Sequence, residues 1–317
     1  MINRILVPLD GSSLAECVLP HTVAVSHALD AEVTLLRAVV REAGPVSRGV
    51  DPLEWQMRKS EADSYLNEVA GRLRRVGLGV NAELEEGQAA ERIITYAREN
   101  HVGLIIISSH GSSGLSRWNI SSVVQKVILK AYAPVMIVRA YQEKTEEVAE
   151  LHYRKLMVPL DGSKRAECTL PWAQRLAHHH DCKLLLAHVV DRPEVPRNNP
   201  LTEEERELVE RLTELNRRNG EEYLEDLMSR VGSDAEARLV VSDDRATALH
   251  DLVKEEEVDV VVMAAHGYSG RATWPYGSMA LNFIAYGSTP LLMVQDLTPE
   301  EAEVSAAERA ASERAGH

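Results

Sequence analysis

A repeat divides this chain into two similar halves. Residues 7–12 read VPLDGS, and the same six residues return at 158–163. Two further matches keep the same spacing: AEC at 15–17 and 166–168, and LP at 19–20 and 170–171. A repeat that preserves its spacing predicts two copies of one domain. The length of 317 residues agrees with this, since single domains commonly hold about 100–200 residues.

Short apolar runs alternate with helical patterns in both copies. They predict strands at residues 5–9, 33–40, 80–84, 104–108 and 135–138, and again at 156–160, 184–190, 237–241, 258–263 and 291–294. In the first copy, helices are expected near 12–29, 54–75, 89–99 and 122–130. Strands that alternate with helices form a parallel sheet covered on both faces, with right-handed crossovers. We therefore predict an α/β protein with two tandem open parallel-sheet domains of five strands each.

The domain boundaries follow from composition. We expect a first domain at residues 1–140 and a polar, charged linker at 141–153. The second domain is expected at 154–296, followed by a charged C-terminal tail at 297–317.

Charge and hydropathy exclude several classes of partner. The net charge of −14 argues against a broad surface for nucleic acid. No apolar run approaches the roughly 18 residues that cross a bilayer, and Asp10 comes too early for a secretory signal. Three cysteines do not make a disulfide framework, so reduced thiols are expected. We expect a cytoplasmic protein that binds neither nucleic acid nor membrane.

A glycine loop follows the fourth strand of the second copy. It carries Gly267 and Gly270, and Gly277 with Ser278 opens the next helical pattern. Glycine allows a positive φ and a close approach of the backbone to a ligand. The helix start adds unpaired N–H groups and the positive end of the helix dipole, while Ser278 can cap the helix. The pattern predicts a cradle for a phosphate group.

These residues together resemble the universal stress protein family in a tandem two-domain form, from about residue 3 to 139 and from 154 to 295. The family pattern is an aspartate that ends the first strand, here Asp10 and Asp161, and a Gly-x-x-Gly-x9-Gly-Ser/Thr loop after the fourth strand. The resemblance implies a Rossmann-like fold, similar to that of the adenine nucleotide α-hydrolases, with strand order 3-2-1-4-5. It also implies ATP binding, with or without Mg²⁺, in members that keep the loop.

The resemblance assigns the nucleotide site residue by residue. In the second domain, Pro159, Asp161 and Val189 are expected around the adenine and ribose, with the phosphates between the glycine loop and the helix start. The residues expected to hold the nucleotide there are Pro159, Asp161, Gly162, Val189, Met263, Ala264, His266, Gly267, Gly270, Gly277, Ser278 and Met279. The weaker first-domain counterparts are Pro8, Asp10, Ala38, Ser108, Gly111, Gly114, Ser121 and Ser122.

The two loops depart from the family pattern to different extents. The second domain changes one glycine, to Ala264, whereas the first changes two, to Ser108 and Ser121. If these positions need a positive φ or a close approach, each serine costs on the order of 1 kcal/mol. Serine hydroxyls can also donate to phosphate, which would weaken binding without abolishing it. We predict an asymmetric protein with its principal nucleotide site in the second domain.

Simpler interpretations stand beside these. Asp10 and Asp161 are also ordinary turn residues. His110 and His266 invite a catalytic role, but without an assignable nucleophile or orienting carboxylate a loop hydrogen bond is favoured. The histidines at 178–180 point in different directions on a helix, which favours a polar helix end over a metal site. No catalytic residue and no metal ligand is therefore assigned.

Three functions remain open. The favoured hypothesis is a non-catalytic, ATP-binding regulatory module of a stress response. The alternatives are an enzyme that hydrolyses ATP or transfers a group from it, and a ligand-free dimerising scaffold. Because the family often pairs domains through the fifth strand, an intrachain pseudo-dimer, a homodimer and an unknown protein partner are all compatible with the sequence.

Overall fold

The structure is a computed structural model that describes residues 3–41, 51–111, 120–131, 133–140, 151–193, 201–232, 234–268 and 276–296. Gly114, Gly270, most of the expected linker and the C-terminal tail lie outside these residues. The chain divides into two compact units, which are described separately. The first unit is Met1–His152 with Ile284–His317, and the second is Tyr153–Phe283.

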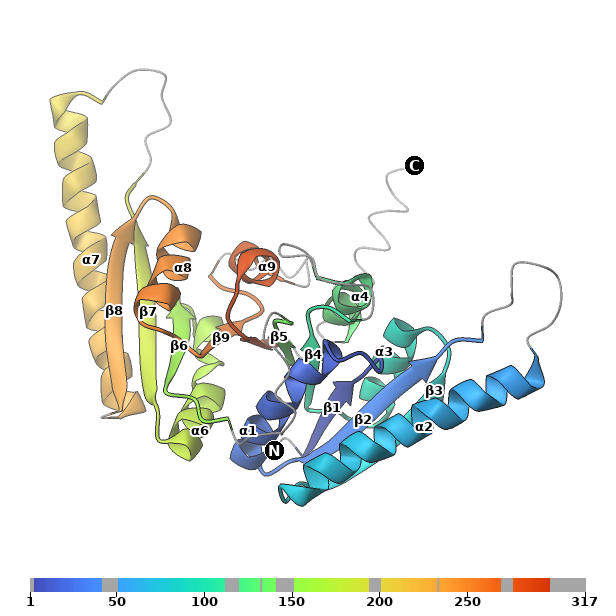
Figure 1. The fold of residues 1–317 in the computed structure, drawn as a ribbon. Helices are drawn as coiled ribbons and strands as arrows, with labels where there is room; N and C mark the ends of the chain where they lie inside the picture. The colour runs from blue at the N-terminus through green and yellow to red at the C-terminus, as the bar shows by residue number, and fades with distance from the viewer. Residues whose placement is uncertain are drawn as a thin grey trace, which may run out of the picture. The chain divides into compact units, whose positions relative to one another are not determined.

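The first unit is a parallel sheet with helices between its strands (Figure 1). Its strands follow the order β3-β2-β1-β4-β5, and β10 joins β5 in the antiparallel direction. The elements are β1 (Arg4–Pro8), η1 (Ala15–Cys17), α1 (Val18–Leu29), β2 (Glu32–Val39), α2 (Pro52–Arg75), β3 (Val80–Glu86), α3 (Ala89–Glu99), β4 (Leu104–Ser108), α4 (Ser122–Lys130), β5 (Val135–Val138) and β10 (Leu291–Val294).

The second unit repeats this arrangement. Its parallel strands follow the order β9-β6-β7-β8, which matches β4-β1-β2-β3 of the first unit. The elements are β6 (Lys155–Leu160), α5 (Lys164–Glu167), α6 (Leu170–His180), β7 (Lys183–Asp191), α7 (Glu203–Val231), β8 (Ala235–Ser242), α8 (Arg245–Glu255), β9 (Val260–Ala264) and the start of α9 (Ser278–Tyr286). Figure 1 shows α7 beside β8 on one face of this sheet and α8 on the other.

Apolar burial explains why the strands lie where they do. Every residue of β4, β5, β9 and β10 is buried, as expected for strands covered on both faces. The described helices alternate with these strands, and most strand pairs are parallel, so the predicted α/β class with mostly parallel strands is confirmed. The predicted bounds of β4, β5, β10, α3 and α4 match the structure residue for residue.

The predicted helix at residues 12–29 was wrong in one respect, because it is two elements. A 3-10 turn, η1, precedes α1, and Ser12 Oγ accepts from Ala15 N at 3.2 Å to cap it. Pro20 lies in the first turn of α1 and has no N–H to bond a carbonyl four residues earlier. Its ring would also clash with the preceding turn of a continuous helix, so α1 begins as a new helix at Val18.

Candidate functional site

A cavity of about 810 Å³ lies in the second unit, over the carboxyl ends of its strands. Its floor comes from the ends of β6 and β9, which pair in parallel. In the sheet, β7 lies on one side of β6 and β9 lies on the other. This is the point of an open α/β sheet at which strand order reverses and ligands commonly bind.

The cavity brings together distant parts of the sequence that the sequence analysis had grouped. Of the twelve residues expected to hold a nucleotide in the second domain, Gly270 lies outside the described residues. The other eleven line the cavity: Pro159, Asp161, Gly162, Val189, Met263, Ala264, His266, Gly267, Gly277, Ser278 and Met279. Their role toward a nucleotide stays a prediction, but their convergence on one cavity is a property of the fold.

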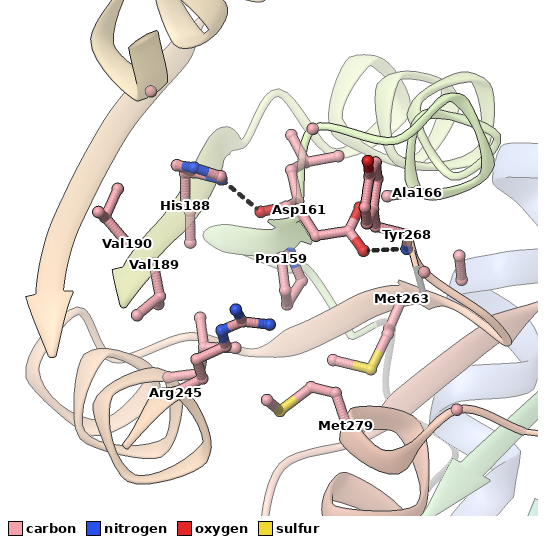
Figure 2. Close-up of a pocket in the computed structure, with 18 of the residues that line it drawn as sticks. Pro159, Asp161, Ala166, His188, Val189, Val190, Arg245, Met263, Tyr268 and Met279 are labelled. Atoms are coloured by element: carbon pink, nitrogen blue, oxygen red, sulfur yellow. Dashed lines mark hydrogen bonds between the residues drawn. The ribbon is translucent and has the colours of Figure 1, made fainter. Parts of the chain in front are cut away.

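Asp161 fastens the glycine loop to the end of the first strand. Its Oδ1 accepts from Ser163 N at 3.0 Å and from Ser163 Oγ at 2.6 Å. Its Oδ2 accepts from Tyr268 N at 2.5 Å, a bond visible in Figure 2. Both carboxylate oxygens are therefore engaged, and the side chain holds a loop that begins about 100 residues further along the chain.

Gly267 is required because Asp161 lies against it. A Cβ placed on Gly267 would stand well inside contact distance of Asp161 Oδ2, and the same holds for Gly111 and Asp10 in the first unit. Neither glycine adopts a positive φ. Of the two reasons the sequence offered for glycine here, a positive φ is therefore wrong, and close approach to a ligand stays a prediction. The structure shows a close approach to the protein's own carboxylate.

Gly277 differs from Gly267 because the protein itself leaves room for a side chain there. Gly277 N donates to Ala265 O at 2.8 Å, which places the start of α9 beside the loop. Among the described residues, the nearest atom to a Cβ on Gly277 would be Ala265 O at 3.5 Å, an ordinary contact. The described part of the fold would therefore accept a small side chain at this position.

The first unit has the same backbone path with serines in it. Ser121 N donates to Ser109 O at 2.9 Å, the counterpart of the Gly277 bond. Ser121 has φ −62°, so the expected strain of a serine at this position is wrong. Its hydroxyl accepts from Val124 N at 3.3 Å as a helix cap. Ser108 Oγ lies 2.6 Å from His110 O and donates to it. These hydroxyls serve the fold, which removes the support for Ser108 as a phosphate donor.

The cavity also has a polar wall that the sequence analysis did not assign. It is formed by His188 and Asp191 on β7, by Asn216, Asn219 and Tyr223 on α7, and by Arg245 on α8. Arg245 Nε donates to Asp191 Oδ1 at 2.5 Å, so this cation is already paired. The only sequence signal was the spacing of 216, 219 and 223, which places polar side chains on one face of a helix.

His188 and Tyr223 offer hydrogen-bonding groups on this wall. His188 Nδ1 lies 2.8 Å from Leu160 O and must donate to it, because a carbonyl cannot donate. The other nitrogen, Nε2, then accepts when the ring is neutral. Burial, aided by the carboxylates of Glu167 and Asp161, raises the pKa of Tyr223, whose ring meets His188 edge-on at 5.8 Å. Tyr223 therefore remains a neutral phenol that can donate a hydrogen bond.

His110 and His266 are both buried, and Ser109 Oγ lies 3.0 Å from His110 Nδ1. Among the described residues, no group of three or more His, Cys, Asp or Glu side chains is arranged to hold a metal ion. Across the same part of the chain, no helix is long and apolar enough to span a membrane.

Comparison with known proteins places this fold and this loop in a family. The sequence matches the universal stress protein family over residues 1–139 and 152–295. The chain belongs to the universal stress protein family. The two matches follow the internal repeat, so the protein contains two universal stress protein domains in tandem.

Several individual proteins are similar to this chain. A universal stress protein of Methanocaldococcus jannaschii is 28% identical over 141 residues, which cover 44% of this chain and 83% of that protein. The crystal structure of a universal stress protein from Archaeoglobus fulgidus covers 94% of this chain and 100% of its own, at 17% identity and a TM-score of 0.66. Another universal stress protein, solved in complex with cAMP, covers 44% of this chain and 98% of its own, at 17% identity and a TM-score of 0.35.

Proposed function

We propose that the second domain binds ATP and that the protein acts as a non-catalytic, nucleotide-binding regulatory module of a stress response. The observation that supports this most directly is the cavity at the carboxyl ends of β6 and β9, lined by Asp161, Gly267 and the start of α9. Its volume of about 810 Å³ falls within the roughly 300–1,000 Å³ of small-molecule sites.

The wall of the cavity offers the kinds of surface that a nucleoside triphosphate requires. Pro159, Val189 and Met263 offer apolar surface to a base, and Asp161 offers a carboxylate to a ribose. Gly277 and Ser278 also line the cavity at the N-terminus of α9, where backbone N–H groups and the helix dipole favour an anion. The room left at Gly277 fits a phosphate oxygen close to the backbone.

The carboxylates of this wall favour binding over hydrolysis. Phosphoryl transfer commonly relies on a carboxylate that holds Mg²⁺ near the transferred group. Two aspartates line the cavity within the described residues, and both are engaged: Asp161 with the loop, and Asp191 with Arg245. When Mg²⁺ accompanies ATP, we expect the phosphates and water to supply most of its ligands. ATP occupancy would order the glycine loop and so shift the surface that a partner protein meets.

Calorimetric titration with ATP tests this proposal. The wild-type protein is expected to bind about one ATP per chain, and Gly267→Asp is expected to abolish the measurable heat. That substitution places a second carboxylate against Asp161, where even a Cβ does not fit.

Gly111→Asp is the matched control, because it makes the same collision with Asp10 in the first unit. It should leave the stoichiometry and affinity unchanged. Equal, weak heats from the wild type and Gly267→Asp would refute the proposal. Mass spectrometry of nucleotide carried through purification gives an independent check.

A further inference from the structure

One difference between the two units lies in their second strand, beside the turn that ends the first strand. Strand register makes the comparison unambiguous, because Pro8 lies opposite Leu36 in the first unit and Pro159 opposite Ala187 in the second. The next residue of the second strand is Arg37 in the first unit and His188 in the second. Arg37 and His188 each lie beside the Asp-Gly turn of their own unit, which carries Asp10 or Asp161.

The turns themselves are nearly identical. Gly11 has φ +86° and Gly162 has φ +84°, a left-handed conformation that favours glycine in both. Ser12 N donates to Asp10 Oδ1 at 2.8 Å, just as Ser163 N donates to Asp161 at 3.0 Å. Any difference in what the turn can receive therefore comes from the side chains around it.

Arg37 covers the first of these turns. A Cβ placed on Gly11 would stand 2.8 Å from Arg37 Cζ and from its Nη2. The guanidinium thus lies directly against the backbone of the turn. At Gly162, by contrast, no described heavy atom beyond its chain neighbours falls within 4 Å of such a Cβ, and Gly162 lines the cavity.

Each side chain is held in its position by a tyrosine of the long helix. Arg37 Cζ lies 5.2 Å from the ring centre of Tyr65 on α2, within the range of a cation–π contact. His188 instead donates to Leu160 O, a bond visible in Figure 2, and meets the ring of Tyr223 on α7 edge-on.

The residue three positions before each tyrosine also differs between the units. It is Gly220 in α7, where a Cβ would stand 2.9 Å from His188 Cδ2, and the buried Ala62 in α2. Gly220 therefore leaves room for the imidazole beside α7.

We propose that Arg37 closes the first unit to nucleosides by covering the Asp10-Gly11 turn, and that position 37/188 therefore decides which unit binds ATP. This inference rests on the proposed function, since it takes the Asp-Gly turn to face the nucleoside. It identifies a determinant outside the glycine loop. The first unit is occupied by its own guanidinium in the place where the second unit presents an open turn.

Removal of the guanidinium in a protein whose second site is disabled tests the proposal. The background is full-length Gly267→Asp, and the probes are adenosine and ATP, followed by calorimetry. Arg37→Ala in this background is expected to bind adenosine at least about tenfold more tightly than Gly267→Asp alone, with ATP gaining by a similar factor. Arg37→Thr, which suits a strand, serves as a second variant and should show the same gain.

Arg41→Ala is the matched control. Arg41 also sends a guanidinium to an aromatic ring of α2, with Cζ 6.0 Å from the centre of Trp55. It should change neither affinity. Thermal unfolding verifies that each variant folds.

The two proposals fail in different ways. A folded Arg37→Ala or Arg37→Thr protein with no gain over Gly267→Asp overturns the role of Arg37. Absence of ATP binding by the wild type counts against the proposed function, whereas a gain in the double variants supports the role of Arg37 in either case.

Discussion

The two units share one backbone arrangement, and we propose that they use it for different purposes. Each ends its first strand with Asp-Gly, anchors a glycine of the loop against that aspartate, and starts a helix from a residue bonded back to the loop. The second unit leaves an open cavity above these parts. In the first, Arg37 lies on the turn, and the hydroxyls of Ser108 and Ser121 bond to the protein.

This comparison separates glycines that the fold explains from the one for which we propose a binding role. Gly111 and Gly267 are equivalent residues of the two units, and the neighbouring aspartate explains both. Gly277 has become Ser121 in the first unit at no cost in backbone strain. A fold can keep the first kind of glycine after its site has changed, so the presence of Gly111 does not indicate a functional first site.

The largest expected effect is from Asp161→Asn. The carboxylate accepts hydrogen bonds on both oxygens, whereas an amide can accept on only one. The loop would lose its anchor at Tyr268 N or at Ser163, and the ribose would lose a charged acceptor. ATP affinity should fall by about 100-fold, or roughly 2.7 kcal/mol. Asp10→Asn is the matched change in the first unit and should leave ATP affinity unaltered; an equal loss in both would remove the asymmetry.

A smaller effect is expected from Gly277→Ser, which gives the second unit the residue of the first. The protein alone accommodates the side chain, so thermal stability should stay the same. A phosphate close to this backbone would not be accommodated, and ATP affinity should fall about tenfold, or roughly 1.4 kcal/mol. Calorimetry and a thermal melt on one preparation measure both. A loss of stability with unchanged affinity would contradict the ligand-based explanation of this glycine.

An ion pair repeated in both units gives a comparison of stability. Arg72 Nη1 lies 2.7 Å from Glu16 Oε2, and Arg230 Nη2 lies 2.7 Å from Glu167 Oε2. The first pair is the more buried on the arginine side, at 19% exposure against 43%. Arg72→Met should therefore cost about 1.5 kcal/mol in urea unfolding, as for a half-buried charged hydrogen bond. Arg230→Met should cost less, and the reverse order would contradict the burial argument.

The second pair should also depend on pH. Burial would raise the pKa of Glu167, but hydrogen bonds from Arg230 and Lys164 outweigh it and lower the pKa. A lowered folded-state pKa adds stability above the ordinary carboxyl value, and this is lost as pH falls through the folded value. The difference in unfolding free energy between wild type and Arg230→Met should therefore shrink in acid. A difference that grew in acid would contradict this sign.

The smallest effect concerns the thiols. Burial raises the pKa of Cys17 to about 11, although a bond to Ser108 Oγ opposes this, and the pKa of Cys182 also rises to about 11. At pH 8 only about one thiol in a thousand would be ionised, and the thiolate is the form that reacts. Cys17 and Cys182 should resist iodoacetamide in the native protein, and peptide mapping by mass spectrometry measures this. Rapid alkylation of Cys17 would show that its burial does not persist.

Local sequence carried most of the fold because it repeats and because its strands are apolar throughout. The sequence predicts the strands at 104–108, 135–138 and 291–294 to the residue, because strands buried on both faces have sharp hydrophobic limits. Strand order then followed from the resemblance. The split of residues 12–29 into η1 and α1 was missed because helix periodicity says little about a short 3-10 turn ahead of a proline.

The sequence by itself determined that this protein has two copies of one α/β domain, each with an aspartate and a glycine loop at the ends of adjacent strands. Only the tertiary structure decided what surrounds them. Asn216, Tyr223 and Arg245 reach the cavity because of how α7 and α8 are rotated about their own axes where they pack on the sheet. A local sequence pattern does not specify that rotation. Arg37 covers its turn under the ring of Tyr65, whereas His188 bonds to Leu160 O and packs beside Gly220. Side-chain direction depends on neighbours distant in sequence, and so it appears only once the chain has folded.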